Sequence, residues 1–206
     1  ACSSTNSAAG CSAAFHWIFQ RSQTLPGYEY EEAFYARGYQ AVCGVDEAGR
    51  GPPGGPVGAA AFIPPAGLCL EGLNAPKNLP EKKREALFPV IQEEAIAWAV
   101  ASATPAEIDE LNILNATMLA MRRAISALSP EADFALIDGN TVRNLPIPAT
   151  AVIKGDSLSC SIAAASILAK VTRDRLCLEL DAAYPQYKIA AHKGYPTAEH
   201  RELVRQ

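Results

Sequence analysis

Short apolar runs and longer segments of helical periodicity alternate along this chain, and turn residues separate them. Apolar runs that end at glycine, proline or an acid are typical of buried strands. They predict strands over about 40–46, 54–63, 134–138 and 150–154. Ile96, Trp98 and Val100 alternate with small residues, which favours a further strand near 95–102; extension of the preceding helix is the alternative.

Segments with an apolar residue every three or four positions predict helices between and after these strands. The expected helices cover about 25–38, 80–94, 104–128 and 157–180, and another begins at 197. Pro89 is expected to kink or divide the second of them, because proline cannot donate a helix hydrogen bond. Thr104 and Glu107 have the spacing of a capping box at the start of the third. Strands interspersed with helices predict an α/β domain with a mixed sheet.

The chain of 206 residues is long enough for one domain with a substantial core, and we expect that domain to span residues 29–206. Residues 1–28 contain no acid and are rich in alanine and serine, which resembles an organelle transit segment. Arg21 carries the only positive charge there, so a disordered tail is the alternative. The expected location is intracellular: the cytoplasm if the chain is bacterial, or a plastid or mitochondrion if residues 1–28 are a transit peptide.

Composition narrows the possible partners. The formal net charge of −4 argues mildly against a nucleic-acid partner, although acids clustered at a metal site also lower the net charge. No run approaches the roughly 18 apolar residues that span a membrane, so no membrane association is expected. The six cysteines form no CxxC pair, and no histidine lies at zinc-ligand spacing. Cys43 and Cys177 lie in apolar stretches and are expected to be buried, which favours a reducing compartment.

Four acidic residues stand where predicted strands end, each close to a glycine. They are Asp46, Glu47, Asp138 and Asp156. Neighbouring residues on a strand point to opposite faces, so Asp46 and Glu47 can serve one site only where the ladder ends. Acids at several strand ends can converge on one edge of a sheet, and oxygen-only ligands suit magnesium or manganese rather than zinc. The structural alternatives are an Asp-Gly turn at 138–139 and a helix N-cap at Asp156.

Several short motifs follow one another along the chain. They are Gly44–Gly51, Asp138–Asn140, Lys154–Ser157, Ala163–Asp174 and His192–Thr197. Together they closely resemble the type 2 ribonucleases H, the ribonuclease HII family, of the kind found in bacteria and organelles. The resemblance covers about 38–201. It implies a ribonuclease H-like fold, with a five-stranded mixed sheet flanked by helices and a small helical C-terminal part.

The resemblance also implies an enzyme, an endonuclease that hydrolyses the RNA strand of RNA–DNA hybrids. The family also incises duplex DNA 5′ to a single embedded ribonucleotide and leaves 3′-hydroxyl and 5′-phosphate ends. Its four metal-binding catalytic acids match Asp46, Glu47, Asp138 and Asp156. A two-metal site for Mg²⁺ or Mn²⁺ is therefore implied at these acids.

Substrate-binding residues are implied by the same resemblance. The ribose-sensing turn of the family matches Gly49, Arg50 and Gly51. Tyr195 matches the tyrosine that packs against the sugar at the junction, and a half-buried packing tyrosine is the alternative. His192 and Lys193 either contact phosphate or form an ordinary exposed turn. The expected partners are an RNA–DNA hybrid and ribonucleotide-containing duplex DNA, bound by a monomer.

Three departures from the family pattern affect these expectations. The turn after the first motif reads Pro53-Gly54-Gly55, which is looser than the leucine–alanine–glycine that is usual in the family. The family usually has Asp-Ser-Lys in a loop near the substrate, where this chain reads Ala75-Pro76-Lys77, so Lys77 alone is retained as a substrate-binding candidate. The family also continues with a further helical stretch, whereas this sequence stops at Gln206, so we expect the C-terminal part to be truncated. A catalytically weak RNA–DNA junction-binding protein is therefore the alternative to an active enzyme.

Overall fold

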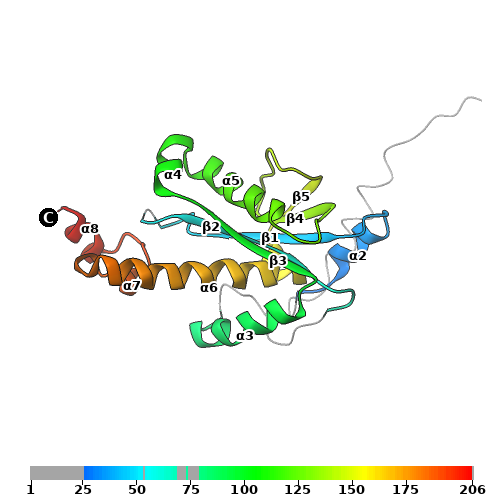
Figure 1. Cartoon of the computed structure of the whole chain (residues 1–206), viewed down its shortest axis with the longest axis horizontal. Helices are drawn as coiled ribbons and strands as arrows, with labels where there is room; N and C mark the ends of the chain where they lie inside the picture. Colours follow the sequence, from blue (N-terminus) through cyan, green and yellow to red (C-terminus); the bar gives the residue numbers. More distant parts are fainter. Residues whose placement is uncertain (1–25, 53, 69–72, 74–78, 206) are drawn as a thin grey trace, which may run out of the picture.

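The computed structural model describes residues 26–52, 54–68, 73 and 79–205, and in this part a five-stranded sheet lies between two layers of helices (Figure 1). The strands are β1 (Val42–Ala48), β2 (Val57–Ile63), β3 (Ala97–Ala103), β4 (Phe134–Asp138) and β5 (Ala149–Val152). They lie in the order β3-β2-β1-β4-β5. β2 runs antiparallel to β1 and β3, whereas β1, β4 and β5 run parallel. The expected mixed sheet is confirmed.

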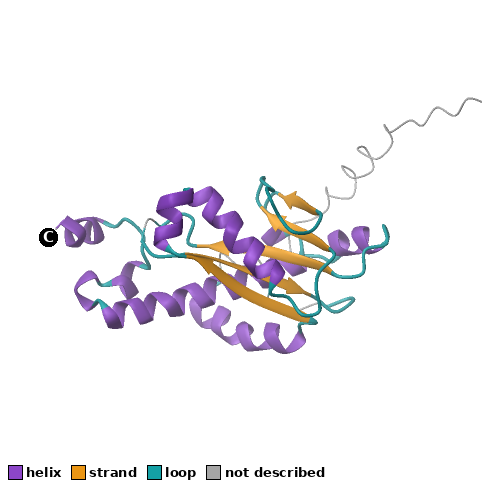
Figure 2. Cartoon of the chain, turned by 45° about the horizontal axis from the view of Figure 1, so that its top comes forward, coloured by secondary structure: helices purple, strands orange, loops and turns teal. Residues whose placement is uncertain are grey.

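Helices cover both faces of this sheet (Figure 2). The α-helices are α2 (Glu29–Tyr35), α3 (Glu81–Glu94), α4 (Pro105–Leu111), α5 (Ile113–Ser126), α6 (Cys160–Ala183), α7 (Ile189–His192) and α8 (Ala198–Arg205). Two 3₁₀ turns, η2 (Gly155–Ser157) and η3 (Pro185–Tyr187), flank α6. α5 packs on one face, and α6 with α3 packs on the other. No helix in the described part is long and apolar enough to span a bilayer.

The core follows from the alternation of side chains along β1. Cys43 and Val45 join the cluster under α5, whereas Val42 and Ala48 belong to clusters that include residues of α6. Gly44 faces α6, and a Cβ there would collide with the backbone of Ser161. This glycine therefore lets the long helix lie directly on the central strand. Cys43 and Cys177 are buried free thiols, as expected.

One expectation about helices is wrong, and another is wrong in part. The segment 104–128 is two helices rather than one, because Asn112 adopts a left-handed backbone (φ 68°) between α4 and α5. Its side chain accepts hydrogen bonds from the N–H groups of Leu114 and Asn115, which caps α5. Pro89 does not divide the helix that contains it, since α3 runs without interruption to Glu94. The Thr104–Glu107 capping box and strand β3 are confirmed.

The described part of the chain begins just before the expected domain boundary. Gly27 forms a parallel bridge with Ser159, and the thiol of Cys160 donates to the carbonyl of Pro26 at 3.0 Å. Behind this contact the buried carboxylate of Glu31 accepts hydrogen bonds from the hydroxyls of Ser159 and Ser161 and from the backbone N–H of Ser161. An anion therefore occupies the N-terminus of α6, where the helix dipole favours negative charge.

Candidate active site at the ends of β1 and β4

Asp46 and Asp138 stand side by side on neighbouring parallel strands. The register pairs Val45 with Ile137, and the next residues along the two strands are Asp46 and Asp138. Neighbouring strands lie about 4.8 Å apart, and residues in register point to the same face. Asp46 is buried, with 1% of its surface exposed, and Asp138 is partly buried. The backbone ladder therefore brings two of the predicted acids to one place.

Asp156 reaches the same edge through the turn after β5. The N–H of Gly155 donates a 2.8 Å hydrogen bond to Oδ1 of Asp138. Asp156 follows in η2 and is buried. The N-cap of α6 is Ser159, whose hydroxyl accepts from the N–H of Ile162, so Asp156 does not cap this helix. This excludes the structural alternative that the sequence allowed for Asp156.

Glu47 lies on the face of β1 opposite to Asp46. The ladder with β2 continues to Ala48, beyond the expected end of the strand. Asp46 pairs with Ala60, which packs in the cluster under α6, whereas Glu47 pairs with Ala59, which packs in the cluster under α5. The Glu47 carboxylate lies 3.7 Å from Nη1 of Arg50. The strand end thus separates the two adjacent acids that the sequence assigns to one site.

The donors gathered at this edge suit a hard divalent cation. Asp46, Asp138 and Asp156 offer carboxylate oxygens only, and two of the three are buried. Magnesium and manganese prefer such oxygen ligands. Among the described residues, no three or more histidine, cysteine, aspartate or glutamate side chains already form a group that could hold a metal ion. The carboxylate oxygens therefore suit a divalent metal ion, but the side chains of the described residues are not arranged as a finished metal site.

The turn that follows β1 carries the predicted ribose-sensing residues. Gly49 has a left-handed backbone (φ 101°), and a Cβ at this position would collide with the side chain of Arg173. A Cβ on Gly51 would meet open space, and the side chain of Arg50 is half exposed. The turn therefore packs on α6 through Gly49 and is open on its other side.

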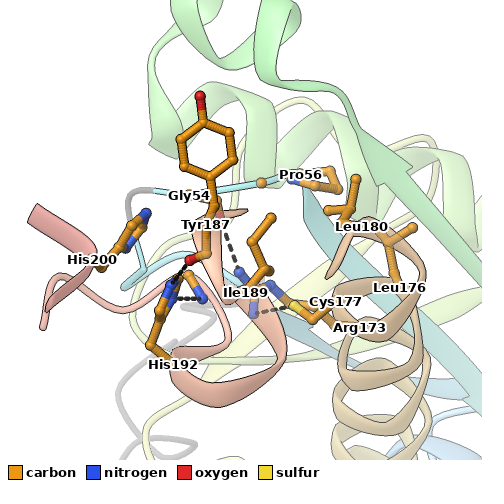
Figure 3. Close-up of a pocket in the computed structure, with 12 residues that line it drawn as sticks. Gly54, Pro56, Arg173, Leu176, Cys177, Leu180, Tyr187, Ile189, His192 and His200 are labelled. Carbon is orange, nitrogen blue, oxygen red and sulfur yellow. Dashed lines mark hydrogen bonds between the residues drawn. The ribbon is translucent and has the colours of Figure 1, made fainter. Parts of the chain in front are cut away.

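The loop after α7 carries the other predicted substrate-binding residues. Tyr195 is 50% exposed, which fits both a ring that faces the substrate and the half-buried packing tyrosine that is the alternative. His192 is buried, and its Nδ1 accepts from the N–H of Gly194 while its Nε2 lies 2.8 Å from the carbonyl of Tyr187 (Figure 3). A carbonyl only accepts, so Nε2 carries the proton. Lys193 forms ion pairs of 2.8 Å with Glu81 and 3.2 Å with Asp174.

Lys193 belongs to a buried ionic cluster that sequence reasoning missed. Asp174 is 3% exposed and pairs with Lys170, Lys193 and Arg84 at 2.6, 3.2 and 3.3 Å. Burial alone would raise the pKa of Asp174, but Lys170 and Lys193 outweigh it and hold this pKa below its ordinary value. The available signal was the polar run Lys170–Arg175, which follows the apolar first half of the same helix. The predicted phosphate contacts of His192 and Lys193 would compete with these internal ones.

Lys77 lies outside the described residues, together with the rest of the departure at 75–77. A cavity of about 250 Å³ lies against the C-terminal half of α6, and its lining includes none of the four predicted acids (Figure 3). Its lining includes Gly54, Arg173, Cys177, Tyr187, His192 and His200. Burial raises the pKa of the Cys177 thiol. The cavity therefore belongs to the support of the Tyr195 loop and not to the acid-bearing edge.

Comparison with known proteins decides the family. A sequence model described as Ribonuclease HII matches residues 43–206, and most of the chain is thus covered. The chain belongs to the ribonuclease HII family. Ribonuclease HII of Aliivibrio fischeri (strain MJ11) is 56% identical over 183 residues, which are 89% of this chain and 86% of that protein. Ribonuclease HII of Dechloromonas aromatica (strain RCB) is 59% identical over 159 residues, 77% of this chain and 81% of that protein.

Solved structures agree with this assignment. Ribonuclease H2 from Pyrococcus horikoshii OT3 superposes with a TM-score of 0.66 at 28% identity, over 79% of this chain and 84% of that one. A ribonuclease HIII solved with Mn²⁺ has a TM-score of 0.64 at 18% identity, over 80% of this chain and 69% of that one, which shows a common fold. The predicted ribonuclease H-like fold is confirmed. The chain is a ribonuclease H-type endonuclease, of a family that acts on RNA–DNA hybrids and depends on divalent metal ions.

Proposed function

We propose that this ribonuclease HII hydrolyses the RNA strand of hybrids and also incises duplex DNA 5′ to a single embedded ribonucleotide, with two divalent ions. The observation that carries the proposal is the register of β1 and β4, which places Asp46 beside Asp138. Gly155 then ties Asp138 to the turn that carries Asp156. Glu47 leaves β1 on the opposite face of the sheet and is included in the proposed set on the family resemblance alone.

These acids would hold Mg²⁺ or Mn²⁺ in the proposed enzyme. When bound, paired divalent ions activate a water and stabilise the charge that develops on the phosphate. The protein's part is to hold its carboxylates in place: Asp46 from the centre of the sheet, and Asp138 through its hydrogen bond from Gly155. Burial of Asp46 and Asp156 excludes bulk water from one side of the site, which strengthens every charge interaction there.

Recognition of ribose is proposed for the Gly49, Arg50 and Gly51 turn together with Tyr195. A 2′-hydroxyl both donates and accepts, so backbone groups of a glycine turn can recognise it. The open side of the turn at Gly51 and the half-exposed ring of Tyr195 are available to a substrate. The sugar junction is identical for every base, so selectivity needs no base-edge contact.

A cleavage assay tests this function. The substrate is a labelled DNA duplex with one internal ribonucleotide, and an all-DNA duplex of the same sequence is the negative control. With Mg²⁺ or Mn²⁺ we expect a single cut 5′ to the ribonucleotide, with a 3′-hydroxyl and a 5′-phosphate at the nick. Asp138→Asn is the matched control, since it removes a charge and keeps the oxygen that accepts from Gly155. Cleavage of the hybrid without any cut at the single ribonucleotide would contradict the finer proposal.

A further inference from the structure

Arg173 lies in the C-terminal half of α6, where three segments of the chain meet (Figure 3). Its side chain is buried, with 4% of the residue exposed. Nη1 donates to the carbonyl of Lys193 at 3.0 Å, and Nη2 donates to the carbonyl of Gly54 at 3.1 Å. One guanidinium group therefore binds both the turn after β1 and the loop that carries Tyr195.

Glycines let the backbone of both segments come this close. A Cβ on Gly49 would collide with Nε and Cδ of Arg173. A Cβ on Gly194 would lie 2.5 Å from the carbonyl oxygen of Gly54 and 3.2 Å from Nη2 of Arg173. The N–H of Gly54 also donates to the carbonyl of Gly194 at 3.3 Å. The guanidinium group is thus packed between two backbone turns with no side chain between them.

The contacts of Arg173 differ from those of an ordinary ion pair. Its polar neighbours are two carbonyls and the sulfur of Cys177 at 3.7 Å. Lys170, Lys193 and Arg84 each form an ion pair with Asp174. Within the described part of the chain, no ion pair involves Arg173. Its buried Nε has no hydrogen-bond partner among the described residues. A buried charge without a counter-ion is costly, so stability alone is a poor reason for an arginine here.

Resting on the proposed function, we propose that Arg173 is a positioning residue that fixes the spacing between the Gly49–Gly51 turn and Tyr195 and so sets the preference for a ribonucleotide junction. Two groups that read adjacent sugars act together only if their separation is fixed, since a misplacement of about 1 Å can cost about 100-fold in rate. The planar fork of arginine binds two carbonyls at once in a defined geometry, which the single ammonium group of lysine cannot reproduce.

Kinetics of Arg173→Met and Arg173→Lys test this role. kcat and KM are measured on the duplex with one ribonucleotide and on a long RNA–DNA hybrid. We expect Arg173→Met to lower kcat/KM for the single ribonucleotide by about 10- to 100-fold. Hybrid cleavage should fall much less, because every sugar of that strand is a ribose. Arg173→Lys should lie between wild type and Arg173→Met. Arg175→Met, an exposed arginine two residues along α6, should keep the wild-type ratio.

A merely structural role gives a different result. Equal losses on both substrates in Arg173→Met, with a lower melting temperature, would overturn the proposal. If neither Arg173 variant folds, Gly194→Ala opens the same contact from the loop side, and an unchanged substrate ratio in that variant would overturn it as well. Wild-type protein that cuts neither substrate would refute the proposed function, and the role of Arg173 would fall with it.

Discussion

The sheet edge that carries the acids and the C-terminal half of α6, which supports Tyr195, are built by different forces. Asp46 and Asp138 are placed by a parallel backbone ladder between two central strands. Tyr195 is placed by side chains: the ion pairs of Lys193, the hydrogen bonds of His192 and the guanidinium group of Arg173. The main chain thus fixes the proposed chemistry, while tertiary side-chain contacts fix the proposed substrate selection. Substitutions in the two regions should therefore fail in different ways.

The largest effect is expected from Asp138→Asn at the sheet edge. Turnover should fall at least about 100-fold on every substrate, because bound metal ions supply several kcal/mol of transition-state stabilisation. The unfolding free energy should stay near that of wild type, since asparagine keeps the acceptor for the Gly155 N–H. Steady-state cleavage and urea unfolding measure the two quantities. Near-normal turnover would remove Asp138 from the site.

Asp174→Asn should have the opposite profile, a loss of stability rather than of chemistry. Removing one partner of a buried ion pair leaves uncompensated charge, so we expect a loss of about 3 kcal/mol at neutral pH. The pKa of Asp174 is lowered in the folded state, so its contribution is present above the unfolded value of about 3.9 and is lost as pH falls through the folded value. The stability gap between variant and wild type should therefore shrink below about pH 4. A gap that is constant with pH in urea unfolding would contradict the ion-pair account.

Tyr195→Ala should change selectivity more than stability. The ring is half exposed, and stacking on an aromatic ring is worth roughly 1–3 kcal/mol in nucleic-acid complexes, so incision at a single ribonucleotide should fall about 10-fold more than hybrid cleavage. Tyr184, which is 52% exposed at the C-terminus of α6, offers the matched control. Tyr184→Ala should leave the ratio unchanged. Equal losses on both substrates in Tyr195→Ala would argue against a junction-sensing ring.

The smallest effect is expected from Arg175→Met, on the exposed side of α6. The side chain of Arg175 and its ion pair with Glu85 are exposed, although the guanidinium group also stacks over the buried ring of Phe88, so the unfolding free energy should change by only about 1 kcal/mol. Cleavage rates should match those of wild type. A large loss here would mean that any charge change on α6 disturbs the Tyr195 loop, and the contrast with Arg173 would then lose its meaning.

Sequence reasoning worked best where the backbone decides the structure. Apolar runs ending at acids predicted β4 with its observed bounds, and the mixed sheet followed from the order of the elements. It failed where one residue overrides a periodic pattern, as Asn112 does between α4 and α5. The division expected at Pro89 is absent: α3 continues past this residue, and its neighbours Phe88 and Ile91 are buried in the core. The spacing of apolar residues alone predicts neither the break at Asn112 nor the continuity of the helix at Pro89.

The candidate site shows the same limit. Asp46 and Asp138 meet because strands order their side chains, and this could be expected from their positions. The ladder to Ala48, which sends Glu47 to the other face, depends on pairing with β2 that no local pattern reveals. The sequence of α6 shows that Arg173 and Asp174 are charged but does not show what they bind. Their partners include Gly54, Arg84 and Lys193, which are distant in the sequence. Contacts between residues so far apart in the sequence are seen only in the three-dimensional structure.

Binding of Mn²⁺ tests the central claim, that the acids at the ends of β1 and β4 form a divalent-cation site, most directly. Electron paramagnetic resonance titration would compare wild type with Asp138→Asn and with Asp174→Asn as a charge-matched control away from the edge. We expect Mn²⁺ to bind wild type and Asp174→Asn alike and to bind Asp138→Asn much more weakly. Equal binding by wild type and Asp138→Asn would contradict the assignment of the metal site to this edge of the sheet.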